Sequence, residues 1–402
     1  MRHKWQLGAM MFLQYAIWGA WAPVLSAYLL GELEFSGTQV GFIYGLLPLA
    51  TIIAPFIGGQ LADRLFPAER VIAALHLGGG VLLLYASTVT DYRQLAWAMM
   101  LYFVLYAPTL ALTNSVAMVN LADSEKEFGR VRVWGTLGWI AAGWLLTAWR
   151  GWAGADLAMG GDMLLLAGAF SLAMGLQSFL LPHTPPRKDA AKPWAFLEAL
   201  RMFRNRNFAV FMLISFVVAT ELQFYYVLTG PFLQSEGIGI SPARVPAVMT
   251  VARLAEILVM AFMLSWFLKR FGMRKTLAIG VIAWPIRYVV FAIGSPWWLV
   301  VASLTLHGFC YVFFFVAAFI YVDGLAPPDI RASAQSLIAI VTLGVGSFVG
   351  TNFAGWILEH FTSGGATDWR AVFVVPCAIT VACAIAYLLF FREERAPDPV
   401  AA

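Results

Sequence analysis

The apolar stretch from Ala247 to Leu264, AVMTVARLAEILVMAFML, constrains this chain more than any other part of its sequence. It is nearly long enough to cross a bilayer, yet it carries Arg253 and Glu256 near its middle. An ionised side chain at the bilayer centre costs about 2.5–3.5 kcal/mol even on a lenient insertion scale. Because the two residues have i, i+3 spacing, they share one helix face and partly neutralise each other. That face must contact protein or water, not lipid.

Two interpretations of this pair are open at the level of sequence. One is an internal salt bridge that only holds helices together. The other is a polar centre that binds a solute or carries a proton. The choice depends on whether the rest of the chain builds a cavity around the pair.

The composition is that of a polytopic membrane protein. Hydrophobic residues make up 61% and charged residues 12% of the 402 residues, whereas a soluble domain carries about 25% charged residues. The long apolar runs fit helices and not the alternating short segments of a β-barrel. The net charge of +4 does not indicate nucleic-acid binding, because membrane topology explains where the basic residues lie. The sequence contains no nucleotide-binding loop, metal-ligand spacing or hydrolase motif, so we expect neither enzyme activity nor a cofactor or metal.

The apolar runs predict an all-α membrane protein with twelve transmembrane helices in two six-helix bundles. The predicted spans are 7–30, 39–62, 69–89, 94–120, 133–150, 163–182, 208–233, 243–268, 275–294, 297–322, 333–358 and 370–391. The longest polar interruption falls between the sixth and seventh spans. The predicted domains are therefore an N-terminal bundle at 1–182, a basic cytoplasmic linker at 183–206, a C-terminal bundle at 207–392 and a cytoplasmic tail at 393–402.

Basic residues predict the orientation of these spans. Of the 26 Lys and Arg residues, 20 fall on one side of the membrane; the opposite side holds Arg93, Arg150, Arg244 and Arg370. The positive-inside rule then places both termini in the cytoplasm, and we expect a multi-pass protein of a bacterial inner membrane. Tight basic loops recur at 59–64 and 269–275, at corresponding places in the two halves. Such a parallel repeat is typical of the major facilitator superfamily.

Polar and aromatic side chains inside the predicted spans are the candidates for a solute-binding cavity. An aromatic wall with scattered amides and a few charges suits a flat, hydrogen-bonding solute. Several candidates recur with the spacing of one helix face, as Arg132, Thr136 and Trp139 do. The candidate substrate-binding residues are Gln14, Trp18, Asn114, Arg132, Thr136, Trp139, Gln223, Tyr226, Arg253, Glu256, His307 and Tyr311.

The ionisable candidates lie in the C-terminal half and suggest proton coupling by Glu256, His307 or Glu221. In a regular helix Glu221 points about 200° away from Gln223, so the two face different surroundings unless the helix bends. Arg287 lies within the ninth predicted span and needs a partner, and either Glu221 or Glu256 would serve.

The chain resembles the nucleoside:proton symporter family of the major facilitator superfamily over nearly its full length. The segments that carry the resemblance are FLQYAIWGAW at 12–21, YAPT at 106–109 with Asn114, RVWGTLGW at 132–139, ELQ at 221–223, AE at 255–256, AWPIR at 283–287, IRASAQ at 330–335 and TDW at 367–369. The resemblance implies that the Arg132 face, Gln223 and the Glu256 site bind a nucleoside, and that an acidic group couples the proton.

The chain departs from the family pattern at three places. Tyr226 stands where the family tends to have Asn, and Arg253 stands where it tends to have Gln. Tyr311 and Val312 stand where the family tends to have an aromatic residue followed by Asp.

The expected function is a secondary active transporter that imports nucleosides with protons by alternating access. We expect a small-molecule substrate, a proton and the lipid bilayer as partners, no nucleic acid, and a monomer. Arg253 and the missing aspartate motivate an alternative with the same fold, a transporter of a sugar or a small organic anion. A membrane sensor or scaffold with a transporter fold is the third hypothesis.

Overall fold

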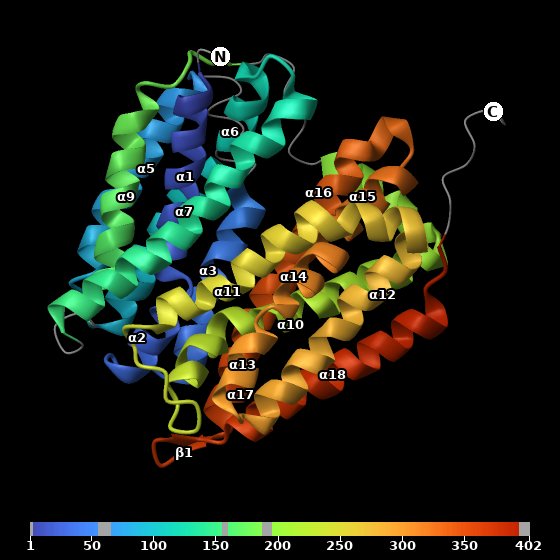
Figure 1. The fold of residues 1–402 in the computed structure, drawn as a ribbon. Helices are drawn as coiled ribbons and strands as arrows, with labels where there is room; N and C mark the ends of the chain where they lie inside the picture. Colours follow the sequence, from blue (N-terminus) through green and yellow to red (C-terminus); the bar gives the residue numbers. More distant parts are fainter. Residues whose placement is uncertain (1–2, 55–65, 155–159, 187–194, 394–402) are drawn as a thin grey trace. The chain divides into compact units, whose positions relative to one another are not determined.

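The structure is a computed structural model that describes residues 3–54, 66–154, 160–186 and 195–393 (Figure 1). Over these residues it is almost entirely helical, and the described part of every predicted span overlaps helical structure. The basic loop at 59–64, part of the linker (187–194) and the tail beyond residue 393 lie outside the described residues. A helix satisfies its own backbone hydrogen bonds, which a bilayer cannot do, so long apolar runs become helices.

The N-terminal helices begin with a broken span. The predicted span 7–30 consists of two helices that are separated at 22–24, where Pro23 lacks a backbone N–H. The helices in this part of the chain are α1 (Lys4–Trp21), α2 (Leu25–Gly31), α3 (Gly37–Ala54), α5 (Ala68–Ala86), α6 (Tyr92–Asn120), α7 (Ser124–Ala153) and α9 (Asp162–Ser178).

The C-terminal helices contain interruptions that were not predicted from the sequence. The helices in this part of the chain are α10 (Arg206–Gln234), α11 (Val245–Leu258), α12 (Leu264–Ile293), α13 (Trp297–Ser303), α14 (Leu306–Cys310), α15 (Ala317–Leu325), α16 (Arg331–Ala339), α17 (Ser347–His360) and α18 (Trp369–Phe390). Three π-helical turns join neighbouring helices, at Val259–Met263, Tyr311–Val316 and Ile340–Gly346. Helix α10 runs through Pro231 to Gln234, although proline lacks the backbone N–H of a regular helical turn.

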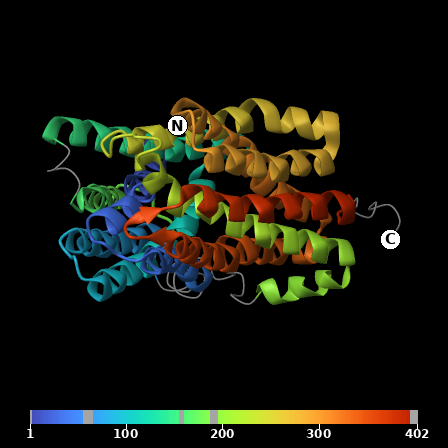
Figure 2. The same cartoon turned by 90° about the horizontal axis from the view of Figure 1, so that it is seen from below.

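The chain reverses its direction within the segment α12. Within α12, Gly272 has a φ of 76°, and the chain turns back on itself there (Figure 2). Glycine adopts this left-handed conformation without the steric cost that other residues meet. The turn separates the eighth and ninth predicted spans, in agreement with the boundary predicted at 269–275.

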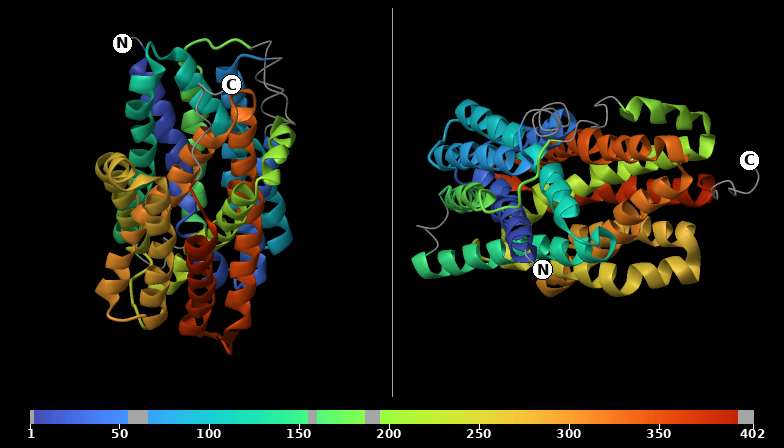
Figure 3. Two further views of the ribbon diagram at one scale, coloured as in Figure 1. Left: turned by 90° about the vertical axis from the view of Figure 1, so that its right-hand side faces the viewer. Right: turned by 90° about the horizontal axis from the view of Figure 1, so that it is seen from above.

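Two short strands and two short helices complete the C-terminal half. The strands β1 (Thr362–Ser363) and β2 (Ala366–Thr367) form an antiparallel hairpin between α17 and α18 (Figure 3). At the end of the predicted polar linker, Ala195–Arg204 form a short helix that packs against α16. A second short helix, Pro328–Ile330, precedes α16.

The chain divides into two compact units. The first unit contains Met1–Ala191 together with Tyr226–Thr250, and the second contains Lys192–Tyr225 together with Val251–Ala402. The end of α10 and the beginning of α11 therefore group with the N-terminal helices. The division at 1–182 and 207–392 stays a prediction.

Close backbone packing organises the first unit. Helix α1 packs against α7 and α9, while α5 packs against α6 and α9 (Figure 1). A Cβ at Gly138 of α7 would overlap the carbonyl oxygen of Phe12 in α1. Small residues at such contacts let apolar helices approach closely where no hydrophobic force drives them together. The contact holds the aromatic side chains of α1 against those of α7.

The second unit uses the same device around α10. Helix α12 packs along α18 and against α14. A Cβ at Gly350 of α17 would lie 2.6 Å from the Cα of Thr220 and 2.9 Å from the Cγ of Gln223. Because Gly350 has no side chain, α17 and α10 approach each other closely at this position. The contact also places Gln223 against α17.

Candidate functional site

The charge pair predicted on the eighth span forms. Nη1 of Arg253 donates to Oε2 of Glu256 at 2.6 Å, within one turn of α11. The side chains are 11% and 13% exposed, so the pair is neither sealed in the interior nor free in solvent. Directly beside it, a Cβ at Gly308 of α14 would lie 2.7 Å from the carbonyl oxygen of Ala255. This close approach brings the next residue candidate, His307, to the same region of the second unit.

Arg287 of α12 lies wholly inside the second unit, among aromatic rings. Its guanidinium carbon is 4.4 Å from the ring centroid of Trp284 and 4.8 Å from that of Tyr225. Its Nη1 is 3.2 Å from Nδ1 of His307. The expectation that Glu221 or Glu256 would pair with Arg287 is wrong, because among the described residues neither carboxylate lies within 4.0 Å of the guanidinium. Cation–π contacts and one imidazole take the place of a carboxylate.

The contact with Arg287 determines the tautomer of the His307 imidazole. A guanidinium has only N–H donors, so Nδ1 of the imidazole must accept, and the ring proton is on Nε2. The imidazole also stacks on Tyr225, with ring centroids 4.5 Å apart, and on Tyr311, with centroids 5.8 Å apart. His307 and Tyr311 thus share a face of the tenth predicted span, and α10 supplies a further ring in contact with the imidazole.

Gln223 and Glu221 of α10 have different surroundings, as the helical geometry predicted. Nε2 of Gln223 donates to Oγ of Ser347 at 2.9 Å. Glu221 is 1% exposed, and the hydroxyl of Tyr288 donates to its backbone carbonyl. Neither oxygen of the Glu221 carboxyl group has a hydrogen-bond partner among the described residues. An interior carboxyl group with no donor is uncommon and calls for a specific explanation.

In the first unit the predicted Arg132 face is assembled by α1 and α7. The guanidinium carbon of Arg132 lies 3.9 Å above the ring centroid of Tyr15. The rings of Trp18 and Trp139 meet edge to face, with centroids 5.4 Å apart. Thr136 is half-buried one helical turn beyond Arg132. The structure therefore brings together four of the candidates at one contact between helices.

Gln14 is placed differently from the other candidates of the first unit. It is fully buried, its Nε2 donates to Thr109 at 2.9 Å, and its Oε1 lies 2.9 Å from Nε2 of His76. Nδ1 of His76 lies 3.2 Å from Oγ of Ser171. Both ends of the Gln14 amide are satisfied within the helices, so its role here is to hold the interior together. Sequence reasoning missed His76, although a histidine inside a predicted span was the signal that had selected His307.

The remaining candidates are half-buried. Asn114 of α6 donates through Nδ2 to the carbonyl of Leu110 at 3.0 Å, and its Oδ1 has no hydrogen-bond partner among the described residues. Tyr226 follows Tyr225 in α10 and belongs to the first unit. The Asn114 amide thus keeps one unused acceptor, whereas both ends of the Gln14 amide are satisfied.

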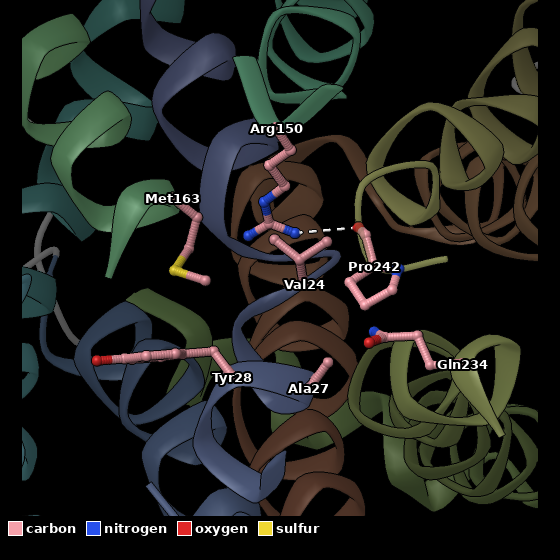
Figure 4. A pocket seen from close by; sticks show the side chains of 7 residues that line it. All are labelled: Val24, Ala27, Tyr28, Arg150, Met163, Gln234 and Pro242. Atoms are coloured by element: carbon pink, nitrogen blue, oxygen red, sulfur yellow. Dashed lines mark hydrogen bonds between the residues drawn. The ribbon is translucent and has the colours of Figure 1, made fainter. Parts of the chain in front are cut away.

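An ion pair that the sequence did not predict lies in the first unit. Arg150, at the end of α7, donates to both carboxylate oxygens of Asp162 in α9, at 2.8 and 2.6 Å. It also donates to the carbonyl of Pro242 at 3.2 Å (Figure 4). The side chains are 4% and 7% exposed. A small pocket beside them is lined by Val24, Ala27, Tyr28, Arg150, Met163, Gln234 and Pro242.

The long apolar helices, together with the solved structures that they resemble, define a membrane transporter of the major facilitator type. The crystal structure of the nucleoside transporter NupG matches with a TM-score of 0.88 and 27% identity over 98% of this chain and 100% of that chain. A bacterial homologue of the lysosomal transporter Spinster, at 16% identity, matches with a TM-score of 0.77 over 98% of each chain and shows the same fold.

The chain belongs to the nucleoside H+ symporter family, which matches residues 1–396. The xanthosine permease of Escherichia coli is 31% identical over 415 residues, which cover 98% of this chain and 97% of the permease. The nucleoside permease NupG of the same organism is 29% identical over 419 residues, 99% of this chain and 98% of the permease. The family resemblance and the helical membrane fold expected from the sequence are confirmed.

Proposed function

We propose that this protein is a secondary active transporter that takes up nucleosides together with protons by alternating access. The observation that carries the proposal is the match of a nucleoside H+ symporter family along residues 1–396, on a chain whose second unit buries the charged residues Glu221 and Arg287. Charged groups inside membrane spans face a substrate or ion pathway in most proteins that retain them. We propose no catalytic step, cofactor or metal for this transport.

The groups proposed to bind the nucleoside are aromatic rings, amide groups and charged side chains. Trp18, Trp139 and Tyr311 offer ring faces for stacking on a base, and Asn114 offers an amide oxygen to its edge. The Arg253–Glu256 pair and Arg132 offer donors and acceptors for hydroxyl groups and ring nitrogens. The full proposed set is Gln14, Trp18, Asn114, Arg132, Thr136, Trp139, Gln223, Tyr226, Arg253, Glu256, His307 and Tyr311. Gln14 acts indirectly, through the interior that it shares with His76.

The pairing of Arg253 favours an uncharged solute over a small organic anion. A free guanidinium would suit an organic anion, but the charge of Arg253 is matched by Glu256 at 2.6 Å. A neutral pair presents hydrogen-bonding groups without a net charge, which suits an uncharged hydroxylated solute. The proposed coupling groups are Glu221, Glu256 and His307.

The proposed setting is a bacterial inner membrane with both termini in the cytoplasm. The excess of basic residues on the predicted inner side supports this orientation. We further propose a monomer that does not bind nucleic acid, with bundles at 1–182 and 207–392, a linker at 183–206 and a tail at 393–402.

Uptake into proteoliposomes tests the proposal. Purified protein should accumulate labelled uridine or adenosine when the pH is lower outside, and the collapse of the gradient by an ionophore should stop accumulation. Glu256→Gln should impair uptake, and Glu236→Gln, an exposed matched control just beyond α10, should not. Gradient-independent or absent uptake of both nucleosides, with hexoses or carboxylates taken up instead, would contradict the proposal.

A further inference from the structure

The Glu221 carboxyl group is the most unusual acid in the second unit. It is 1% exposed, and both of its oxygens lack hydrogen-bond partners among the described residues. Glu256, by contrast, has a guanidinium 2.6 Å away and is partly accessible. An ionised carboxylate without donors is far costlier to bury than the neutral acid, so the arrangement around Glu221 suits a carboxyl group that carries a proton.

A buried cation without a carboxylate lies in the same interior. Arg287 is fully buried, and its Nε and Nη2 have no hydrogen-bond partner among the described residues. Guanidinium groups stay charged in proteins, so this positive charge is permanent. Tyr288, the next residue in α12, donates its hydroxyl to the Glu221 carbonyl and so ties the two helices together at this level. Over its described residues, the second unit therefore contains a buried carboxyl group that accepts no hydrogen bond, Glu221, and a buried guanidinium that has no carboxylate partner, Arg287.

We propose that Glu221 is the residue that carries the coupled proton and that Arg287 becomes its counter-ion when the proton leaves. The inference rests on the proposed symport function and deepens it. Proton binding forms an O–H bond on the Glu221 carboxyl group, and release leaves a carboxylate that attracts the two N–H groups of Arg287. No oxidation or group transfer takes place, and the only charge that changes is that of Glu221.

The surroundings of Glu221 contain few other titratable groups. Tyr288 faces it from α12 and has Arg287 as its other charged neighbour, and Cys383 faces it from α18. The groups beside Arg287 in α14 are His307 and Cys310. His307 already uses Nδ1 to accept from Arg287, so a proton cannot be added there without breaking that contact. Glu221 is the group in this cluster that gains or loses a proton without first losing a partner.

The position of Glu221 in α10 explains how proton release would change the contacts of the proposed nucleoside-binding residues. Gln223, two residues further on, bonds to Ser347, and Tyr225 stacks on His307 and lies under the Arg287 guanidinium. Movement of Arg287 toward an ionised Glu221 takes its charge away from Tyr225 and its N–H away from His307. The proton and the proposed nucleoside contacts are thus coupled through one turn of α10 and one side chain of α12.

Two transport modes separate coupling from cargo binding. Gradient-driven accumulation requires net proton movement, whereas counterflow at equal pH requires only that loaded carriers exchange nucleoside. For one coupled proton, a pH difference of one unit supports about tenfold accumulation. Wild-type protein and Glu236→Gln should show both modes. Glu221→Gln should keep counterflow and accumulate no nucleoside above the external concentration.

Each outcome has a distinct meaning. Accumulation by Glu221→Gln at the wild-type level would overturn the assignment of Glu221. Wild-type protein without uridine or adenosine counterflow would overturn the proposed function instead. Because glutamine introduces an unpaired amide, Glu221→Met serves as a second variant that needs no hydrogen bond. Loss of counterflow in both variants, while wild type retains it, would also overturn the inference, since a residue that only carries the proton is dispensable for exchange.

Discussion

The buried Arg150–Asp162 pair supports a quantitative prediction about stability. Arg150→Met removes two hydrogen bonds to the Asp162 carboxylate, at 2.8 and 2.6 Å, and one to the carbonyl of Pro242, at 3.2 Å. Asp162 would remain 7% exposed with its charge uncompensated. Breaking a buried pair from one side costs about 3–5 kcal/mol. The lost hydrogen bond to a backbone carbonyl adds about 1 kcal/mol.

The double variant Arg150→Met with Asp162→Leu makes this prediction specific. Replacement of both charges by apolar groups of similar size is often close to neutral, because no charge is left without a partner. We therefore expect the apparent melting temperature in detergent to fall clearly for Arg150→Met and to recover most of the loss in the double variant. Arg244→Met provides a matched control, since Arg244 is an exposed arginine of the segment before α11.

Fluorescence-monitored thermal unfolding in one detergent provides the measurement. A single variant that melts with the wild type would refute the reasoning, because the pair would then contribute nothing. A double variant as unstable as Arg150→Met would show that packing of the Arg150 side chain, and not the unpaired carboxylate, causes the loss. In either case the ion pair would not be what holds α7, α9 and the segment before α11 together.

Two further variants test the packing of the first unit. His76→Leu should leave the Oε1 of Gln14 without a donor and lower stability by about 1–3 kcal/mol, seen as a lower melting temperature; unchanged melting would mean that another group replaces the imidazole. Gly138→Ala should push α7 away from the Phe12 carbonyl and reduce the yield of monodisperse protein, whereas Gly129→Ala, with open space around it, should not. Equal yields from both would indicate that α1 and α7 shift without cost.

The helical architecture could be predicted from the sequence because a bilayer imposes it locally. Each long apolar run must satisfy its own backbone hydrogen bonds, and a helix is the one local structure that does so. The Arg253–Glu256 pair was predictable for the same reason, since residues at i and i+3 of a helix meet regardless of what surrounds them. The opposite directions of Glu221 and Gln223 followed from the helical repeat alone.

The partners of the buried charges could not be predicted, because they come from helices distant in the sequence. Arg287 was expected beside a glutamate, but packing of α10, α12 and α14 gave it aromatic rings and His307 instead. Gln14 was predicted to bind substrate, but in the structure its amide contacts His76 of α5.

The sequence by itself thus determined that this protein is a bundle of membrane-spanning helices with charge at mid-span. Only the tertiary structure decided which of those charges are paired. The physical reason is that a helix sets the direction of each side chain locally, whereas its neighbours depend on how far and at what rotation two helices pack. Glycine contacts such as those at Gly138 and Gly350 set that packing, and through it the surroundings of Arg132 and Gln223.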